Sequence, residues 1–107
     1  MKVIALVGDA NTGKSHTINI VYSFLLRDGY DQVPGHFRIL GNIINKDFFD
    51  ILEFDDIMIG FVGMGDFING ANSLKRLLED LEDRGCDIAI CGCRTNNRII
   101  AAVQSYP

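Results

Sequence analysis

Apolar residues along this chain form short continuous runs that alternate with segments of helical periodicity. Such runs are typical of buried strands, and they occur at residues 2–7, 37–40, 49–54, 57–62 and 87–93. Apolar side chains at helical spacing predict helices at residues 14–27, 72–84 and 97–104. Strands that alternate with helices predict an α/β fold in which right-handed crossovers build a mainly parallel sheet.

The connection between two of these strands predicts a local exception. Asp55 and Asp56 are the only residues between the runs 49–54 and 57–62. Two turn-favouring residues at such a place predict a β-hairpin, which adds an antiparallel pair and makes the sheet mixed.

Length, composition and charge limit the classes of protein to which the chain can belong. Its 107 residues, 48% hydrophobic and 22% charged, suit a single domain over residues 1–107. The net charge of -4 argues against direct binding to nucleic acid, and no apolar run is long enough for a membrane span. Because the first residues lack the pattern of a signal peptide, we expect a cytoplasmic protein.

The cysteines of the chain, Cys86, Cys91 and Cys93, lie close together near its end. A zinc site needs four ligands, and neither His16 nor His36 lies at finger-like spacing from them. We therefore interpret the cysteines as small buried thiols in a reducing compartment.

One segment carries a recognisable chemical motif. Residues 8–15 match G-x-x-x-x-G-K-[ST] without a mismatch, and they read Gly8, Asp9, Ala10, Asn11, Thr12, Gly13, Lys14 and Ser15. The segment follows a predicted strand and opens a predicted helix, which is the context that the motif requires. The sequence therefore predicts a phosphate-binding loop.

The residue types in this loop suit a triphosphate with its metal ion. Gly8 and Gly13 allow close approaches that a Cβ atom would block, so that successive backbone amides converge on the phosphates. The helix that follows adds its positive amino-terminal end. The Lys14 ammonium reaches the β- and γ-phosphates, and the Ser15 hydroxyl is a natural Mg²⁺ ligand. His16 follows on the first helical turn as a further candidate for nucleotide contact.

With this motif between a strand and a helix, the chain resembles P-loop NTPases over roughly its first quarter. The resemblance implies a three-layer α/β domain with helices on both faces of a P-loop-type, mainly parallel sheet. It also implies binding of ATP or GTP with Mg²⁺, and hydrolysis or transfer of the γ-phosphoryl group. Residues 63–66 and 93–95 further resemble small uncharacterised P-loop ATP-binding proteins of bacteria and their phages, from which no reaction follows.

The same resemblance implies an acid on the metal side of the site, and Asp66 is the candidate. It comes four residues after the run 57–62, where Gly63 and Gly65 let the backbone turn back toward Ser15. The alternative is that Asp66 only enters a turn or a helix. Arg94 ends the last predicted strand, where it contacts the γ-phosphate in the transition state or is a plain surface arginine.

Base specificity is inferred by elimination. Asn45, Lys46 and Asp47 differ from the guanine-reading N-K-x-D motif in spacing and in position, and D-x-x-G is absent after the candidate strand. We therefore expect ATP rather than GTP.

The sequence leaves three interpretations of function. The first is an Mg²⁺-dependent ATPase or small phosphotransferase with Lys14 and Arg94 as catalytic residues. The second is a nucleotide-binding regulatory subunit without turnover, because the chain has little length for a lid or an acceptor site. In the third, a protein partner or a second copy of the chain completes the site.

Overall fold

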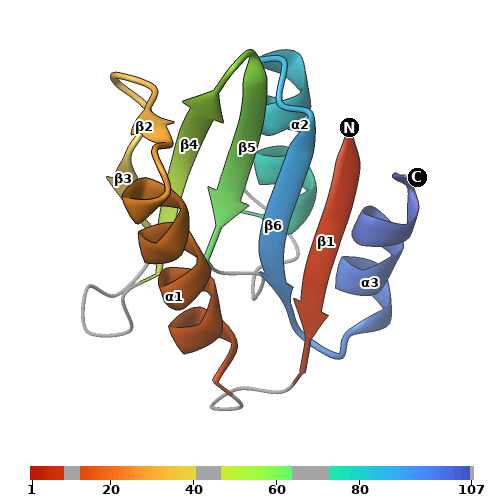
Figure 1. The fold of residues 1–107 in the computed structure, drawn as a ribbon. Coiled ribbons are helices and arrows are strands. Elements are labelled where there is room, and N and C mark those ends of the chain that lie inside the picture. Colours follow the sequence, from red (N-terminus) through yellow and green to blue (C-terminus); the bar gives the residue numbers. More distant parts are fainter. Residues whose placement is uncertain (9–12, 41–46, 64–72, 107) are drawn as a thin grey trace.

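The computed structural model describes residues 1–8, 13–40, 47–63 and 73–106, and in these ranges the chain forms a sheet with helices on both sides (Figure 1). The strands are β1 (Lys2–Val7), β2 (Asp31–Gln32), β3 (Arg38–Ile39), β4 (Phe48–Phe54), β5 (Ile57–Val62) and β6 (Ile88–Cys93). The helices are α1 (Lys14–Arg27), α2 (Leu74–Asp83) and α3 (Asn97–Gln104). No helix in the described ranges is long and apolar enough to cross a membrane.

The pairing of the strands corrects the expected fold. The sheet order is β1-β6-β5-β4-β2, with β3 also paired to β4. Only β6 makes parallel pairs, with β1 and with β5, whereas β4 pairs antiparallel with β5, β2 and β3. The expectation of a three-layer P-loop-type fold around a mainly parallel sheet is therefore wrong. The reason is local: β4 turns directly into β5, and the short strands β2 and β3 pair along the outer edge of β4 without crossover helices.

The predicted hairpin between residues 49–54 and 57–62 is confirmed. Phe54 pairs with Ile57, so the turn consists of Asp55 and Asp56 alone. Both have positive φ angles, 47° and 67°, as a two-residue turn of the primed type requires. Aspartate tolerates this left-handed region better than most residues, which explains why the turn forms without glycine.

The side of the sheet covered by α2 and α3 is apolar and closed. Four leucines of α2 are buried, with exposures of at most 1%: Leu74, Leu77, Leu78 and Leu81. They pack in one cluster with Phe49 and Ile51 of β4 and with Cys91 and Cys93 of β6. Full burial of each leucine stabilises the fold by roughly 1.5–3 kcal/mol. This cluster is the larger part of the hydrophobic core.

The other side of the sheet is covered by α1 and contains buried polar groups. Ile18 is the one fully buried residue of α1, and it packs with Phe48 and Phe61 of the sheet. Asp50 lies on the same face with an exposure of 0%. Its Oδ2 atom accepts hydrogen bonds from the Tyr22 hydroxyl at 2.6 Å and from Gln32 at 3.0 Å. The side of the sheet that faces α1 is therefore partly polar.

Candidate functional site

The ends of four strands meet where α1 begins. The parallel strands β1, β6 and β5 end at this edge of the sheet, and β4 starts there because it runs in the opposite direction (Figure 1). The Gly8 amide donates to the Cys93 carbonyl at 2.9 Å, and the Gly63 amide donates to the Phe48 carbonyl at 2.7 Å. Ligands of open α/β sheets bind at the carboxyl ends of parallel strands, so this edge is the first place to look for a site.

Helix α1 starts with an uncapped amino-terminal turn. Gly13 stands before the first helical residue with φ 85° and ψ 10°, in the left-handed region that glycine adopts without strain. Gly13 has no side chain that could cap the helix, and among the described residues no side-chain cap is found at this end. The amino end of a helix carries partial positive charge and directs amide hydrogens outward, which suits an anion.

Lys14 lies across the opening between the two ends of the loop. Its Nζ atom donates to the Gly8 carbonyl at 2.6 Å, which holds the ammonium group over the carboxyl end of β1. An open pocket of about 370 Å³ lies beside it, lined by Ala5, Leu6, Val7, Gly8, Gly13, Lys14 and Thr17. The structure thus combines a cation, a helix start and a cavity large enough for several phosphate groups.

Ser15 contacts a buried carboxylate. Its hydroxyl donates to Oδ1 of Asp47 at 2.5 Å, and the Gly63 carbonyl oxygen lies 3.3 Å from the Oγ atom of Ser15. Asp47 is only 5% exposed, and a short hydrogen bond to a carboxylate is stronger than one between neutral groups. A serine hydroxyl that donates its proton keeps its lone pairs for a further interaction, such as ligation of a cation. Oxygen ligands of this kind are those that Mg²⁺ prefers.

Glycine at position 63 makes this arrangement sterically feasible. A Cβ atom on Gly63 would lie 2.9 Å from the Phe48 nitrogen and 3.2 Å from its carbonyl oxygen. Both atoms belong to the backbone and cannot move aside as a flexible side chain can. The amide of Leu40 also donates to the Asp47 carbonyl at 3.0 Å. Gly63, which follows β5, and Leu40, which follows β3, therefore hold Asp47 against Ser15.

The structure brings some of the predicted site residues together. Gly8, Gly13, Lys14 and Ser15 meet at the edge described above, and Arg94 follows the last residue of β6 at the same edge with an exposed side chain. His16 is exposed on the first turn of α1. The remaining candidates lie outside the described residues, and these are Asp9, Ala10, Asn11, Thr12 and Asp66.

Asp47 is the site residue that the sequence analysis did not find. The sequence points to it only as part of a guanine-reading motif. In a parallel sheet, an acid at the start of a strand would lie at the edge opposite the carboxyl ends of the strands. In a hairpin, however, the start of the first strand lies beside the end of the second. The hairpin was predicted, and it implies that Asp47 reaches the strand edge at which Gly8 ends β1.

The cysteines fit their interpretation as buried thiols. Cys86, Cys91 and Cys93 are free and buried, and burial raises the pKa of the Cys91 thiol to about 12. Burial also raises the pKa of Cys93, although the nearby Lys14 charge acts in the opposite direction. Such thiols stay protonated and unreactive at neutral pH. Within the described ranges, no group of three or more His, Cys, Asp or Glu side chains is arranged around a metal ion.

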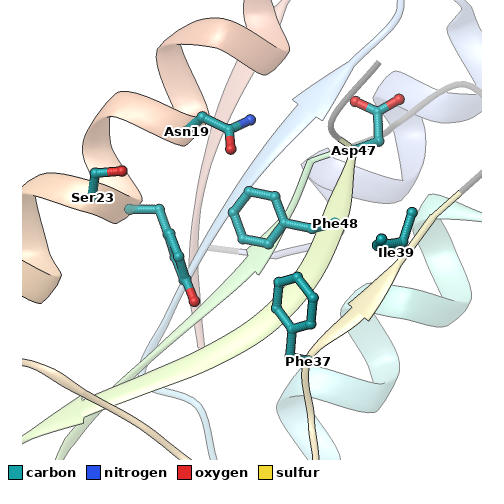
Figure 2. A pocket seen from close by; sticks show the side chains of 7 residues that line it. Asn19, Ser23, Phe37, Ile39, Asp47 and Phe48 are labelled. Carbon is teal, nitrogen blue, oxygen red and sulfur yellow. The ribbon is translucent and has the colours of Figure 1, made fainter. Parts of the chain in front are cut away.

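A second pocket, of about 340 Å³, lies on the other flank of α1 and shares Asp47 with the site (Figure 2). Asn19, Tyr22 and Ser23 of α1 line one wall. Phe48 lies between that wall and Phe37, whose ring stacks on Phe48 at a centroid distance of 6.1 Å.

We found no significant match to this chain among models of protein families, curated proteins or solved structures.

Proposed function

We propose that the loop at residues 8–15 binds the phosphates of ATP together with Mg²⁺ and supports slow hydrolysis or transfer of the γ-phosphoryl group. The observation that supports it best is the pair of contacts at the start of α1, where Lys14 contacts Gly8 and Ser15 contacts Asp47. A complete phosphate-loop motif thus begins a helix at the carboxyl ends of three parallel strands. This proposal rests on local geometry, because the sheet as a whole has a different strand pairing.

The residues of the site divide between binding the phosphates and holding the metal ion. Phosphate oxygens replace the Gly8 carbonyl as partner of the Lys14 ammonium, which then neutralises charge on the β- and γ-phosphates. Ser15 would hold Mg²⁺ through its oxygen, and Asp47 orients the Ser15 hydroxyl by accepting a hydrogen bond from it. Bound Mg²⁺ supplies further charge neutralisation to the phosphates. Arg94 is available at the same edge to contact the γ-phosphate.

A reducing compartment such as the cytoplasm fits three buried free thiols, and we place the protein there. The phosphate donor is proposed to be ATP, with GTP as the alternative. A protein without turnover of its own, acting as a nucleotide-binding regulatory subunit, is the second candidate function. It shares the phosphate site and differs only in the fate of the γ-phosphate.

Phosphate release and thermal unfolding separate these proposals. Mg-ATP is expected to raise the melting temperature of the wild type and of Lys75→Ala, whose exposed lysine lies on α2 far along the chain from the site. Lys14→Ala is expected to lose this shift and any Mg²⁺-dependent phosphate release. A shift without release in wild type supports the regulatory subunit. Equal behaviour of the Lys14→Ala and Lys75→Ala variants contradicts the proposed phosphate site.

A further inference from the structure

The two pockets lie on opposite flanks of α1. Lys14 and Thr17 line the first pocket, whereas Asn19, Tyr22 and Ser23 line the second. Since successive residues of a helix are turned by about 100°, these two sets face directions that differ by about 160°. The first pocket lies against β1 and the loop ends, and the second lies against β3 and the start of β4. A nucleotide in the first pocket therefore leaves the second pocket available.

Asp47 connects the phosphate site to the second pocket. Its carboxylate accepts a hydrogen bond from the Ser15 hydroxyl at 2.5 Å, and the same residue lines the second pocket. Ser15 is adjacent to Lys14, which is assigned to the γ-phosphate under the proposed function. A molecule in the second pocket that contacts Asp47 is therefore separated from Ser15 by a single hydrogen-bonded residue.

The walls of the second pocket suit a planar ring. Phe48 is 4% exposed, and the Tyr22 ring contacts it edge to face at 4.7 Å between centroids. The Tyr22 hydroxyl is hydrogen-bonded to Asp50 and Gln32, which fixes this wall. Phe37, on the opposite side, is 53% exposed and so offers its ring at the mouth of the pocket. Aromatic surfaces of this kind favour stacking with flat heterocycles.

Charge and size restrict the ligand further. Among the described residues that line the pocket there is no lysine or arginine, and its one charged group is the Asp47 carboxylate. The Asp47 carboxylate repels a phosphate group placed beside it, whereas a neutral ligand with a hydroxyl group finds an acceptor in Asp47. The volume of about 340 Å³ lies at the small end of the roughly 300–1,000 Å³ range of ligand pockets.

From these observations we propose that the second pocket binds a neutral nucleoside as the acceptor of the γ-phosphoryl group. The inference rests on the proposed function for its phosphate donor. A hydroxyl oxygen of the sugar forms a bond to the γ-phosphorus of Mg-ATP as the bond from this phosphorus to the β,γ-bridging oxygen breaks. Asp47 orients the hydroxyl group as a hydrogen-bond acceptor, and the hydroxyl proton is released to solvent. The products are a nucleoside monophosphate and ADP.

Direct binding tests the pocket without any turnover. Adenosine, guanosine, cytidine and thymidine are titrated into the protein in the presence of saturating Mg²⁺ and a non-hydrolysable ATP analogue, and the shifts of backbone amide resonances are followed by NMR. At least one nucleoside is expected to shift resonances around Phe48. Phe37→Ala should weaken this binding about tenfold. Phe24→Ala removes another exposed ring, from a part of α1 outside the pocket, and should leave the binding unchanged.

The outcomes distinguish failure of the acceptor pocket from failure of the phosphate site. Binding of the ATP analogue without any nucleoside binding, or equal effects of Phe37→Ala and Phe24→Ala, overturns the acceptor pocket alone. Absence of binding by the analogue overturns the proposed function and the acceptor role together. With Mg-ATP, mass spectrometry should detect the monophosphate of the nucleoside that binds. Tighter binding of nucleoside monophosphates than of nucleosides contradicts the charge argument.

Discussion

The two sides of the sheet are built differently, although the same strands supply both. The α2 side is a continuous apolar cluster in which four leucines of a single helix are almost completely buried. The α1 side buries one residue of its helix fully and includes the carboxylates of Asp47 and Asp50. Both pockets described above adjoin α1. The comparison shows that most of the buried apolar packing lies on one side of the sheet, whereas the polar and charged groups of the candidate site lie on the other.

The starts of the two helices show the same division. Ser73 caps α2 by accepting a hydrogen bond from the Arg76 amide at 3.3 Å, which satisfies one of the unpaired amides. Helix α1 begins at Gly13, which has no side chain for this purpose. A capping side chain would occupy the space in which an anion binds. Glycine at the start of α1 is therefore consistent with a phosphate site, and relative to a capping side chain it costs only about a few tenths of a kcal/mol of helix stability.

The largest expected effect comes from removing packing on the α2 side. Leu78→Ala leaves a cavity at a residue with 0% exposure and should lower the free energy of unfolding by about 2–5 kcal/mol. Phe24→Ala, on the outer surface of α1, should change it by less than about 0.5 kcal/mol. Denaturant titrations of the two variants measure both values. Similar losses in the two variants would contradict the unequal roles of the two sides.

A smaller effect is expected where the strand ends contact each other. Gly63→Ala forces a Cβ atom to within 2.9 Å of the backbone of Phe48 and should lower the free energy of unfolding by about 1–3 kcal/mol. The matched control is Gly92→Ala, because the nearest atom to its Cβ would be 3.5 Å away, an ordinary contact.

The control variant should therefore stay within about 1 kcal/mol of wild type. NMR should also show larger changes in the resonances around Ser15 in Gly63→Ala than in Gly92→Ala, whose Cβ atom makes only an ordinary contact at 3.6 Å with the Gly63 carbonyl. An unaffected Ser15 in the first variant would show that Gly63 does not position Asp47.

Much of the fold can be predicted from local sequence patterns, and the errors in that prediction have a common cause. The leucine spacing of α2 and the apolar runs at β1, β5 and β6 predict those elements because burial imposes them locally. Strand pairing depends on which edges meet, and the two-residue strands β2 and β3 carry too few residues for a pattern. The predicted phosphate loop is a local motif, whereas Asp47 enters the site through the hairpin. Predicting that Asp47 belongs to the site therefore requires knowledge of the strand order.

The smallest expected effect is a pH dependence of stability on the α1 side. Burial, together with the hydrogen bond to Asp50, raises the pKa of Tyr22 from 10.0 to about 12. This pKa is higher in the folded than in the unfolded chain. The contribution of the Tyr22 hydroxyl to the free energy of unfolding is therefore complete below about pH 10 and is lost as the pH rises toward 12.

The Tyr22→Phe variant isolates this contribution, since the buried cysteines with raised pKa values are present in both proteins. Unfolding measured between about pH 9 and pH 11 should show a steeper loss of stability in wild type than in the variant. Parallel curves would mean that the Tyr22 hydroxyl does not depend on its buried contacts with Asp50 and Gln32.

Calorimetric titration with ATP tests most directly the claim that the start of α1 holds a polyphosphate. In the presence of Mg²⁺, titration of wild type with ATP is expected to give a heat signal that fits one binding site per chain. The Lys14→Ala variant should bind ATP at least tenfold more weakly. Folded wild-type protein that gives no heat with ATP, ADP or GTP at several temperatures, or a variant that binds as tightly as wild type, would contradict the account.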